Sequence, residues 1–111
     1  MDAGITPQDL TVLRRQAPAP LVIDVRRDPV FKSAPDRIAG AMRQDPATIG
    51  HWAGTIPNDA PVIVYCVHGH EVSQKAAQAL RDLGLNARFL EGGIEAWRAA
   101  GGALEANAAQ P

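Results

Sequence analysis

The sequence predicts an α/β domain with a parallel sheet and helices on both of its faces. Residues 21–25 and 61–65 are short, nearly continuous apolar runs, which are typical of strands buried on both faces. A segment with helical periodicity follows the second run, and another short apolar run, residues 87–90, comes after it. Strands that alternate with helices in this way form parallel sheets through right-handed crossovers.

Length and composition are those of one domain. The chain has 111 residues, of which 46% are hydrophobic and 21% are charged. We expect a single domain over residues 1–102 and a disordered, alanine-rich tail over residues 103–111. The net charge of −1 gives no field that attracts nucleic acid or an anionic membrane, so we expect neither as a partner.

The chain contains one cysteine, Cys66, which excludes an internal disulfide. No apolar run approaches the ~20 residues of a membrane span, and the N-terminus lacks the basic and apolar segments of a secretory signal. We therefore expect a cytoplasmic protein whose thiol stays reduced.

The first half of the chain begins with a helix and a strand. Thr6 followed by Pro7 signals a helix start, with Thr6 as the N-cap. The strand at residues 21–25 follows, and residues 26–29 form a loop at its carboxyl end. The pattern then weakens, and we expect a short strand at 38–42 and a short helix at 46–53.

The second half continues the alternation. Ser73 is the expected cap of a helix that Gly84 closes, and residues 87–90 form the next strand. Gly92 and Gly93 then turn the chain into a last helix, on which Trp97 faces the core.

Cys66 lies where the strand at 61–65 breaks into a polar loop before a helix. The loop contains a glycine and cannot continue the strand, so we expect the sulfur at a surface-facing turn. Backbone N–H groups and the positive end of the helix dipole favour a thiolate in such a position. The competing interpretation is that Cys66 is only a small buried hydrophobe.

Polar residues follow several of the predicted strands. Arg26 and Arg27 come after the first strand, Cys66 after the second and Glu91 after the third. Because parallel strands collect reactive groups at their carboxyl ends, we expect these four side chains on one rim of the sheet.

Five segments follow one another as they do in single-domain rhodanese sulfurtransferases, and the chain resembles that family over residues 5–101. The segments are Ile23-Asp24-Val25-Arg26, Phe31 with residues 38–41, the Tyr65-Cys66 loop, the Ala76-Ala77 helix and residues 91–97. The resemblance implies a rhodanese-like fold with a central, mostly parallel five-stranded sheet and helices on both faces. It implies no cofactor.

The resemblance also implies a reaction in which the Cys66 thiolate takes a sulfane sulfur from a donor such as thiosulfate. The resulting persulfide passes that sulfur to cyanide, a small thiol or a protein thiol. The loop whose amides would hold the anionic sulfur consists of Val67, His68, Gly69, His70, Glu71, Val72 and Ser73. Gly69 allows this loop to curl. We expect a monomer or a weak dimer.

The loop departs from the family in two ways. It is one residue longer than usual, a length that resembles the loop of the rhodanese-fold cell-cycle phosphatases and arsenate reductases. Those phosphatases close the loop with an arginine, but the corresponding residue here is Val72, preceded by Glu71. Phosphoryl transfer needs positive charge around the phosphate oxygens, so the sequence disfavours phosphatase activity and also weakens the case for efficient thiosulfate binding.

Two supporting residues come from the first strand. Asp24 lies among apolar residues, so we expect it to accept hydrogen bonds that brace the site. Arg26 either steers anions in place of the missing loop arginine or forms a surface salt bridge with Asp28 or Glu91.

The loop also contains two histidines. His68, His70 and Cys66 lack the ligand number of a zinc site, so we expect no metal. The histidines either supply protons to the reaction or are ordinary surface residues. Glu71 either selects against anionic donors or simply points into water near the helix start, and we favour the second role.

Three functions remain open from the sequence. The favoured one is a rhodanese-type sulfurtransferase with Cys66 as nucleophile. The alternatives are a cysteine-dependent phosphatase or arsenate reductase-like enzyme, and a non-catalytic rhodanese-fold binding module.

Overall fold

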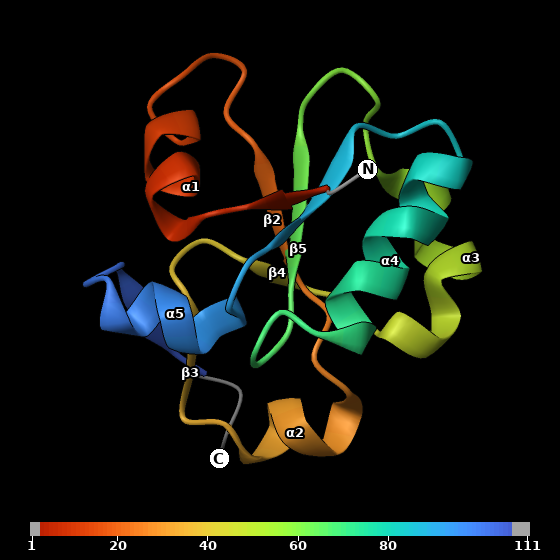
Figure 1. Cartoon of the computed structure of the whole chain (residues 1–111). Coiled ribbons are helices and arrows are strands. Elements are labelled where there is room, and N and C mark those ends of the chain that lie inside the picture. Colours follow the sequence, from red (N-terminus) through yellow and green to blue (C-terminus); the bar gives the residue numbers. More distant parts are fainter. Residues whose placement is uncertain (1–2, 108–111) are drawn as a thin grey trace.

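A parallel five-stranded sheet forms the centre of the protein, in a computed structural model that describes residues 3–107 (Figure 1). Its strand order is β1-β6-β5-β2-β4. The strands are β1 (Gly4–Ile5), β2 (Leu21–Asp24), β4 (Met42–Arg43), β5 (Val62–Tyr65) and β6 (Ala87–Leu90), and every neighbouring pair is parallel. The predicted α/β fold with a five-stranded sheet is confirmed.

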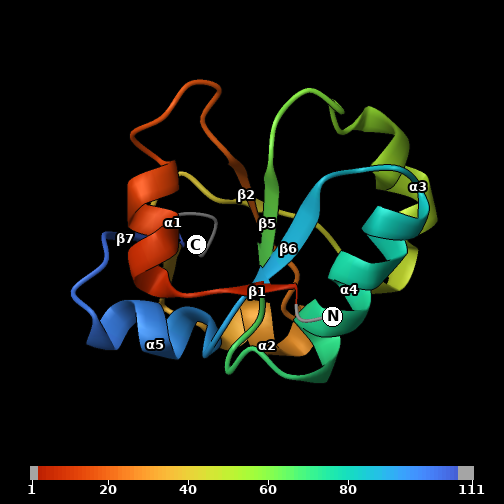
Figure 2. The same cartoon turned by 45° about the horizontal axis from the view of Figure 1, so that its top comes forward.

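Helices cover both faces of this sheet, as predicted (Figures 1 and 2). The covering helices are α1 (Pro7–Leu13), α3 (Ile49–Trp52), α4 (Glu71–Asp82) and α5 (Gly93–Ala99), whereas the short helix α2 (Asp28–Ser33) lies beyond the carboxyl ends of the strands. On one face of the sheet, Val62 and Val64 of β5 pack against α3 and α4. On the other face, Ile63 and Tyr65 pack against α1 and α5. Alternate residues of β5 thus supply two separate hydrophobic cores. No helix within residues 3–107 has the length and apolar character needed to cross a membrane.

The predicted start of α1 is confirmed, whereas that of α4 is wrong by three residues. Thr6 and Asp9 form a reciprocal capping box at α1. At α4 the helix begins at Glu71 with His70 as the N-cap, and Ser73 lies inside the first turn. Ser73 is fully buried, and its hydroxyl accepts a hydrogen bond from Cys66 instead of capping the helix.

The structure also differs from the prediction where the sequence pattern was weak. The expected strand at 38–42 is two strands, β3 (Asp36–Ile38) and β4, which a turn at Gly40 separates. The expected helix at 46–53 is divided into two 3-10 turns, Pro46–Thr48 and Ala53–Thr55, with α3 between them. Helix α2 begins at Asp28, inside the expected loop at residues 26–29.

The expectation of a disordered tail from residue 103 is wrong for residues 103–107. Strand β7 (Leu104–Ala106) pairs antiparallel with β3. The adjacent Asn107 is buried, and its side-chain amide donates to the carbonyl of Ala34 at 2.9 Å. Backbone pairing of this kind leaves little signal in an alanine-rich sequence. Residues 108–111 lie outside the described part of the chain.

Candidate active site

Cys66 follows the central strand β5 directly, at the carboxyl edge of the sheet. All four residues of β5 are buried, so the strand fixes the position of the cysteine backbone. The Cys66 side chain is 7% exposed and opens onto a cavity of about 290 Å³. The other residues that line this cavity are Arg26, Arg27, Val30, Val67, His68, His70, Glu71 and Val72. The loop after β5 therefore faces the start of α2.

Contacts with the start of α5 hold the loop in place. The carbonyls of Cys66 and Val67 accept hydrogen bonds from the backbone N–H groups of Ile94 and Glu95, at 3.0 and 3.2 Å. At Gly93 a Cβ would collide with both of these carbonyls. Glycine is needed there because the two backbones approach each other so closely.

The loop keeps its amides available. Within residues 3–107, the N–H groups from Val67 to Ser73 donate no hydrogen bond, and the first N–H of α4 that does so belongs to Gln74. Gly69 adopts a φ of 73°, which allows the backbone to curl as the sequence predicts. Free N–H groups at the start of a helix stabilise an anion through direct hydrogen bonds and the helix dipole.

Within the described residues, Ser73 makes the one side-chain hydrogen bond to the cysteine sulfur. The Cys66 thiol donates to the Ser73 hydroxyl oxygen at 3.1 Å. Ser73 is fully buried on the first turn of α4, so the hydroxyl is held in position. When the thiol is ionised, the same hydroxyl has the donor hydrogen to stabilise the thiolate.

Asp24 is the centre of a buried hydrogen-bond network beneath the site. Its carboxylate accepts from Arg26 Nη2 at 2.6 Å and from the Tyr65 hydroxyl at 2.9 Å. Burial lowers the pKa of Arg26, but the Asp24 carboxylate more than offsets this, and the net shift is upward. Burial and the Asp24 charge raise the pKa of Tyr65 well above its usual value, so its hydroxyl remains a donor. The hydrogen bonds expected at Asp24 are present.

Of the two roles that the sequence left open for Arg26, the surface salt bridge with Asp28 or Glu91 is not formed. Arg26 is 3% exposed, and its guanidinium bonds to Asp24 and to the carbonyl of Asp36. A buried carboxylate attracts a buried guanidinium more strongly than an exposed carboxylate does, because solvent does not screen the pair.

Glu71 lies at the rim of the cavity and points into water, as the sequence analysis favoured. Its side chain is 65% exposed and lies between Lys75 at 3.2 Å and Arg27 at 3.9 Å. The histidines His68 and His70 are also exposed, with ring centroids 6.0 Å apart. Within residues 3–107, no group of three or more His, Cys, Asp or Glu side chains has an arrangement that could hold a metal ion.

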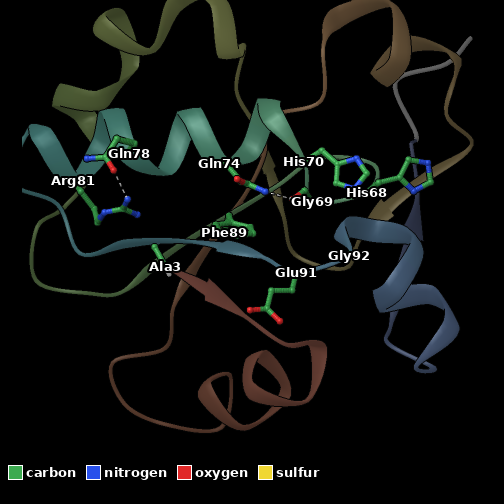
Figure 3. Close-up of a pocket in the computed structure, with 10 residues that line it drawn as sticks. All are labelled: Ala3, His68, Gly69, His70, Gln74, Gln78, Arg81, Phe89, Glu91 and Gly92. Carbon is green, nitrogen blue, oxygen red and sulfur yellow. Dashed lines mark hydrogen bonds between the residues drawn. The ribbon is translucent and has the colours of Figure 1, made fainter. Parts of the chain in front are cut away.

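A larger cavity of about 760 Å³ lies on another side of the loop (Figure 3). Glu91 lines this cavity and not the one at Cys66, so only three of the four expected rim groups share the cysteine cavity. His68 and His70 line both. Figure 3 shows the Gln74 amide of α4 bonded to the carbonyl of Gly69 at 2.9 Å, which ties the loop to the helix.

Sequence reasoning did not identify Val30 and Tyr65 as parts of the site. Val30 lies in α2, whose apolar pattern is too short to predict which face it presents. Tyr65 ends a fully apolar strand, where its hydroxyl gave no indication of a partner. Tyr65 and Asp24 are 41 residues apart in the sequence. Only the pairing of β2 with β5 brings them side by side.

The fold and the site define an α/β protein that carries one cysteine on an amide-rich loop at the carboxyl edge of a parallel sheet. The family model of the rhodanese-like domain matches residues 6–100. The chain therefore belongs to the rhodanese-like family, and the predicted family is confirmed.

Several curated relatives and solved structures are similar to the chain. The thiosulfate sulfurtransferase GlpE of Pseudomonas fluorescens (strain SBW25) is 38% identical over 95 residues, 85% of this chain and 83% of that protein. GlpE of Pseudomonas putida (strain GB-1) is 35% identical over 86% and 84% of the two chains. A rhodanese-related protein from Thermoplasma volcanium has a TM-score of 0.78 and 27% identity, covering 92% of this chain and 96% of its own.

Another solved structure bears on the phosphatase alternative. A Rhodopseudomonas palustris protein of unknown function, described as a possible tyrosine phosphatase, has a TM-score of 0.80 and 26% identity. The match covers 94% of this chain and 85% of that protein. Shared architecture alone does not assign the reaction, which depends on the residues of the loop.

Proposed function

We propose that the protein is a sulfurtransferase that carries a sulfane sulfur on Cys66 as a persulfide. The curated relatives bear out the enzyme class, since those named above are thiosulfate sulfurtransferases. The observation that carries the proposal is the position of Cys66, which opens onto a cavity next to a loop of unpaired amides. A thiolate and a persulfide both need such donors.

The reaction has two displacements. The Cys66 thiolate attacks the outer sulfur of a donor such as thiosulfate, the S–S bond of the donor breaks, and sulfite leaves with the electron pair. An acceptor thiolate or cyanide then attacks the outer sulfur of the Cys66 persulfide, and the thiolate is released. Dividing the transfer in this way replaces one difficult step with two easier ones.

The surrounding residues have distinct roles in this proposal. The amides from Val67 to Ser73 hold the negative charge of the thiolate or of the terminal persulfide sulfur. The Ser73 hydroxyl orients the Cys66 sulfur. Asp24 and Arg26 act as positioning residues, because the Arg26 guanidinium at the cavity wall is bonded to the buried carboxylate of Asp24.

Phosphatase or arsenate reductase activity is the weaker alternative. Both arginines that line the Cys66 cavity, Arg26 and Arg27, already face the carboxylates of Asp24 and Glu71. A phosphoryl group needs uncompensated positive charge around its oxygens. A non-catalytic binding module would need neither a buried serine hydrogen-bonded to the cysteine thiol nor unpaired amides in the loop beside it.

The acceptor is a small thiol, cyanide or a protein thiol, and the enzyme works as a monomer or a weak dimer. A reducing compartment such as the cytoplasm suits it, because the free Cys66 thiol would otherwise be oxidised.

Mass spectrometry of the intact protein tests the proposal. Incubation with a sulfane-sulfur donor should add the mass of one sulfur atom, and cyanide should remove it. The variant Cys66→Ser should gain no sulfur under the same conditions. Wild-type protein that remains unmodified with every donor would rule the proposal out.

A further inference from the structure

The cavity at Cys66 is walled to a large extent by valines. Val30, Val67 and Val72 line it, and Val30 is among the large apolar residues that remain exposed, at 43%. Val30 belongs to α2 and the other two belong to the loop and to α4, so the apolar wall comes from both sides of the opening. Such a wall gains free energy by contact with an apolar group of a substrate.

Each arginine that lines the cavity faces a carboxylate. Arg26 is bonded to the buried Asp24 through Nε and Nη2. Arg27 lies 3.9 Å from Glu71, whose other oxygen contacts Lys75 at 3.2 Å. Solvent screens this exposed pair, so it contributes little to stability. It still matters for ligands, because it leaves a carboxylate at the mouth of the cavity.

The loop amides are consequently the main source of positive potential for a bound anion. Amide dipoles stabilise one negative charge well, as in other anion holes. A second charge on the same ligand has to be removed from water without a free cation to meet it, which is costly.

We propose that the enzyme prefers a sulfane-sulfur donor that carries one negative charge and an apolar group over a dianion such as thiosulfate, and that Glu71 is a residue that sets this preference. This inference rests on the proposed sulfurtransferase function. It identifies the class of donor for the Cys66 site.

Organic thiosulfonates have this chemistry. The Cys66 thiolate attacks the outer sulfur of the thiosulfonate, the S–S bond to the sulfonyl group breaks, and a sulfinate leaves with the electron pair. The charges balance, because the thiolate and the thiosulfonate carry one negative charge each, and so do the products, the Cys66 persulfide and the departing sulfinate. With thiosulfate the leaving sulfite carries two negative charges. Arg26 and Arg27 do not balance them, because each is already paired with a carboxylate.

Steady-state kinetics with cyanide as the acceptor tests the preference. The donors are thiosulfate, methanethiosulfonate and benzenethiosulfonate, and the Cys66→Ser variant provides the uncatalysed background. We expect kcat/KM to be at least about tenfold higher for methanethiosulfonate than for thiosulfate, which corresponds to one missing charge-assisted contact. Benzenethiosulfonate should exceed methanethiosulfonate because its ring contacts the valines.

Variants separate charge from apolar contact. Glu71→Gln frees Arg27 and should raise kcat/KM for thiosulfate about fivefold, with less than about a twofold change for the thiosulfonates. The control is Asp59→Asn, which changes the net charge equally but lies before β5, at the other end of the sheet. Val30→Ala should lower kcat/KM selectively for benzenethiosulfonate.

The outcomes are distinguishable. Thiosulfate turnover equal to or faster than that of the thiosulfonates would overturn the inference, as would a Glu71→Gln variant whose thiosulfate kcat/KM is unchanged or lower. Both results would leave the sulfurtransferase function intact. If no donor adds sulfur to Cys66, the proposed function fails and the inference fails with it.

Discussion

The hydroxyl of Ser73 accepts a hydrogen bond from the Cys66 thiol at 3.1 Å, which links the end of the central strand to the first turn of α4. Both residues are buried, so neither side chain has to be ordered when a substrate arrives. Preorganised contacts of this kind stabilise charge without reorganisation during the reaction.

Removal of the Ser73 hydroxyl should slow sulfur transfer without unfolding the protein. We expect Ser73→Ala to lower kcat/KM about tenfold, since one hydrogen bond to a charged sulfur is lost. The measurement is steady-state sulfurtransferase kinetics together with thermal unfolding. Ser33→Ala is the control, because that hydroxyl bonds only to the carbonyl of Pro29 on α2. Equal kinetics for Ser73→Ala and wild type would contradict this role.

Gly69 should not tolerate a side chain. Its φ is 73°, and a Cβ would lie 2.6 Å from the backbone nitrogen of Gly92. We expect Gly69→Ala to destabilise the fold by about 2–3 kcal/mol and to abolish most activity, because strain and collision both displace the loop. Gly84→Ala is the matched control. Gly84 has a φ of 91° but no atom within 4 Å of the position that a Cβ would take. Its substitution by alanine therefore adds backbone strain without a collision, and we expect it to lower the free energy of unfolding by about 1 kcal/mol.

Loss of Arg26 should be among the costlier single changes near the site. The variant Arg26→Met leaves the fully buried carboxylate of Asp24 without its cation, which we expect to cost about 3–5 kcal/mol in the free energy of unfolding. Urea denaturation measures the cost. The double variant Asp24→Asn/Arg26→Met should recover part of it, since no buried charge remains. An additive loss in the double variant would show that the pair does not act as a unit.

The contact between Asp36 and Arg98 predicts a pH dependence. The Arg98 guanidinium, which bonds Asp36 at 2.8 and 2.9 Å, holds the pKa of that carboxyl below its usual value. A lowered pKa in the folded state stabilises the protein above the unfolded-state value of ~3.9, and this stabilisation disappears as pH falls through the folded-state pKa.

The variant Asp36→Asn tests this dependence. Because the pair is partly exposed, we expect the free energy of unfolding of the wild type to exceed that of the variant by only about 0.5–1 kcal/mol at pH 7. The difference should shrink between pH 4 and pH 2 in urea denaturation, by the principle of proton linkage. A stability difference that grows on acidification would have the wrong sign. Asp59→Asn controls for the loss of one surface carboxylate.

The sequence by itself determined the class of fold, the family and the position of the one cysteine at the end of a buried strand. Continuous apolar runs at β2 and β5 indicated buried parallel strands, and the carboxyl ends of such strands lie on one edge of the sheet. Cys66, the loop after it and Gly69 followed from that geometry. These features are local, or repeat along the chain with a fixed period, so they can be read without knowing any contact.

Only the tertiary structure decided which partners the polar side chains have. Ser73 contacts Cys66 instead of capping α4, Arg26 pairs with Asp24 instead of an exposed carboxylate, and Glu91 faces another cavity. Strand β7 pairs with β3 across more than sixty residues of sequence. Hydrogen bonds, charge pairing and burial depend on distances between segments that are far apart in the chain, and no local pattern encodes those distances.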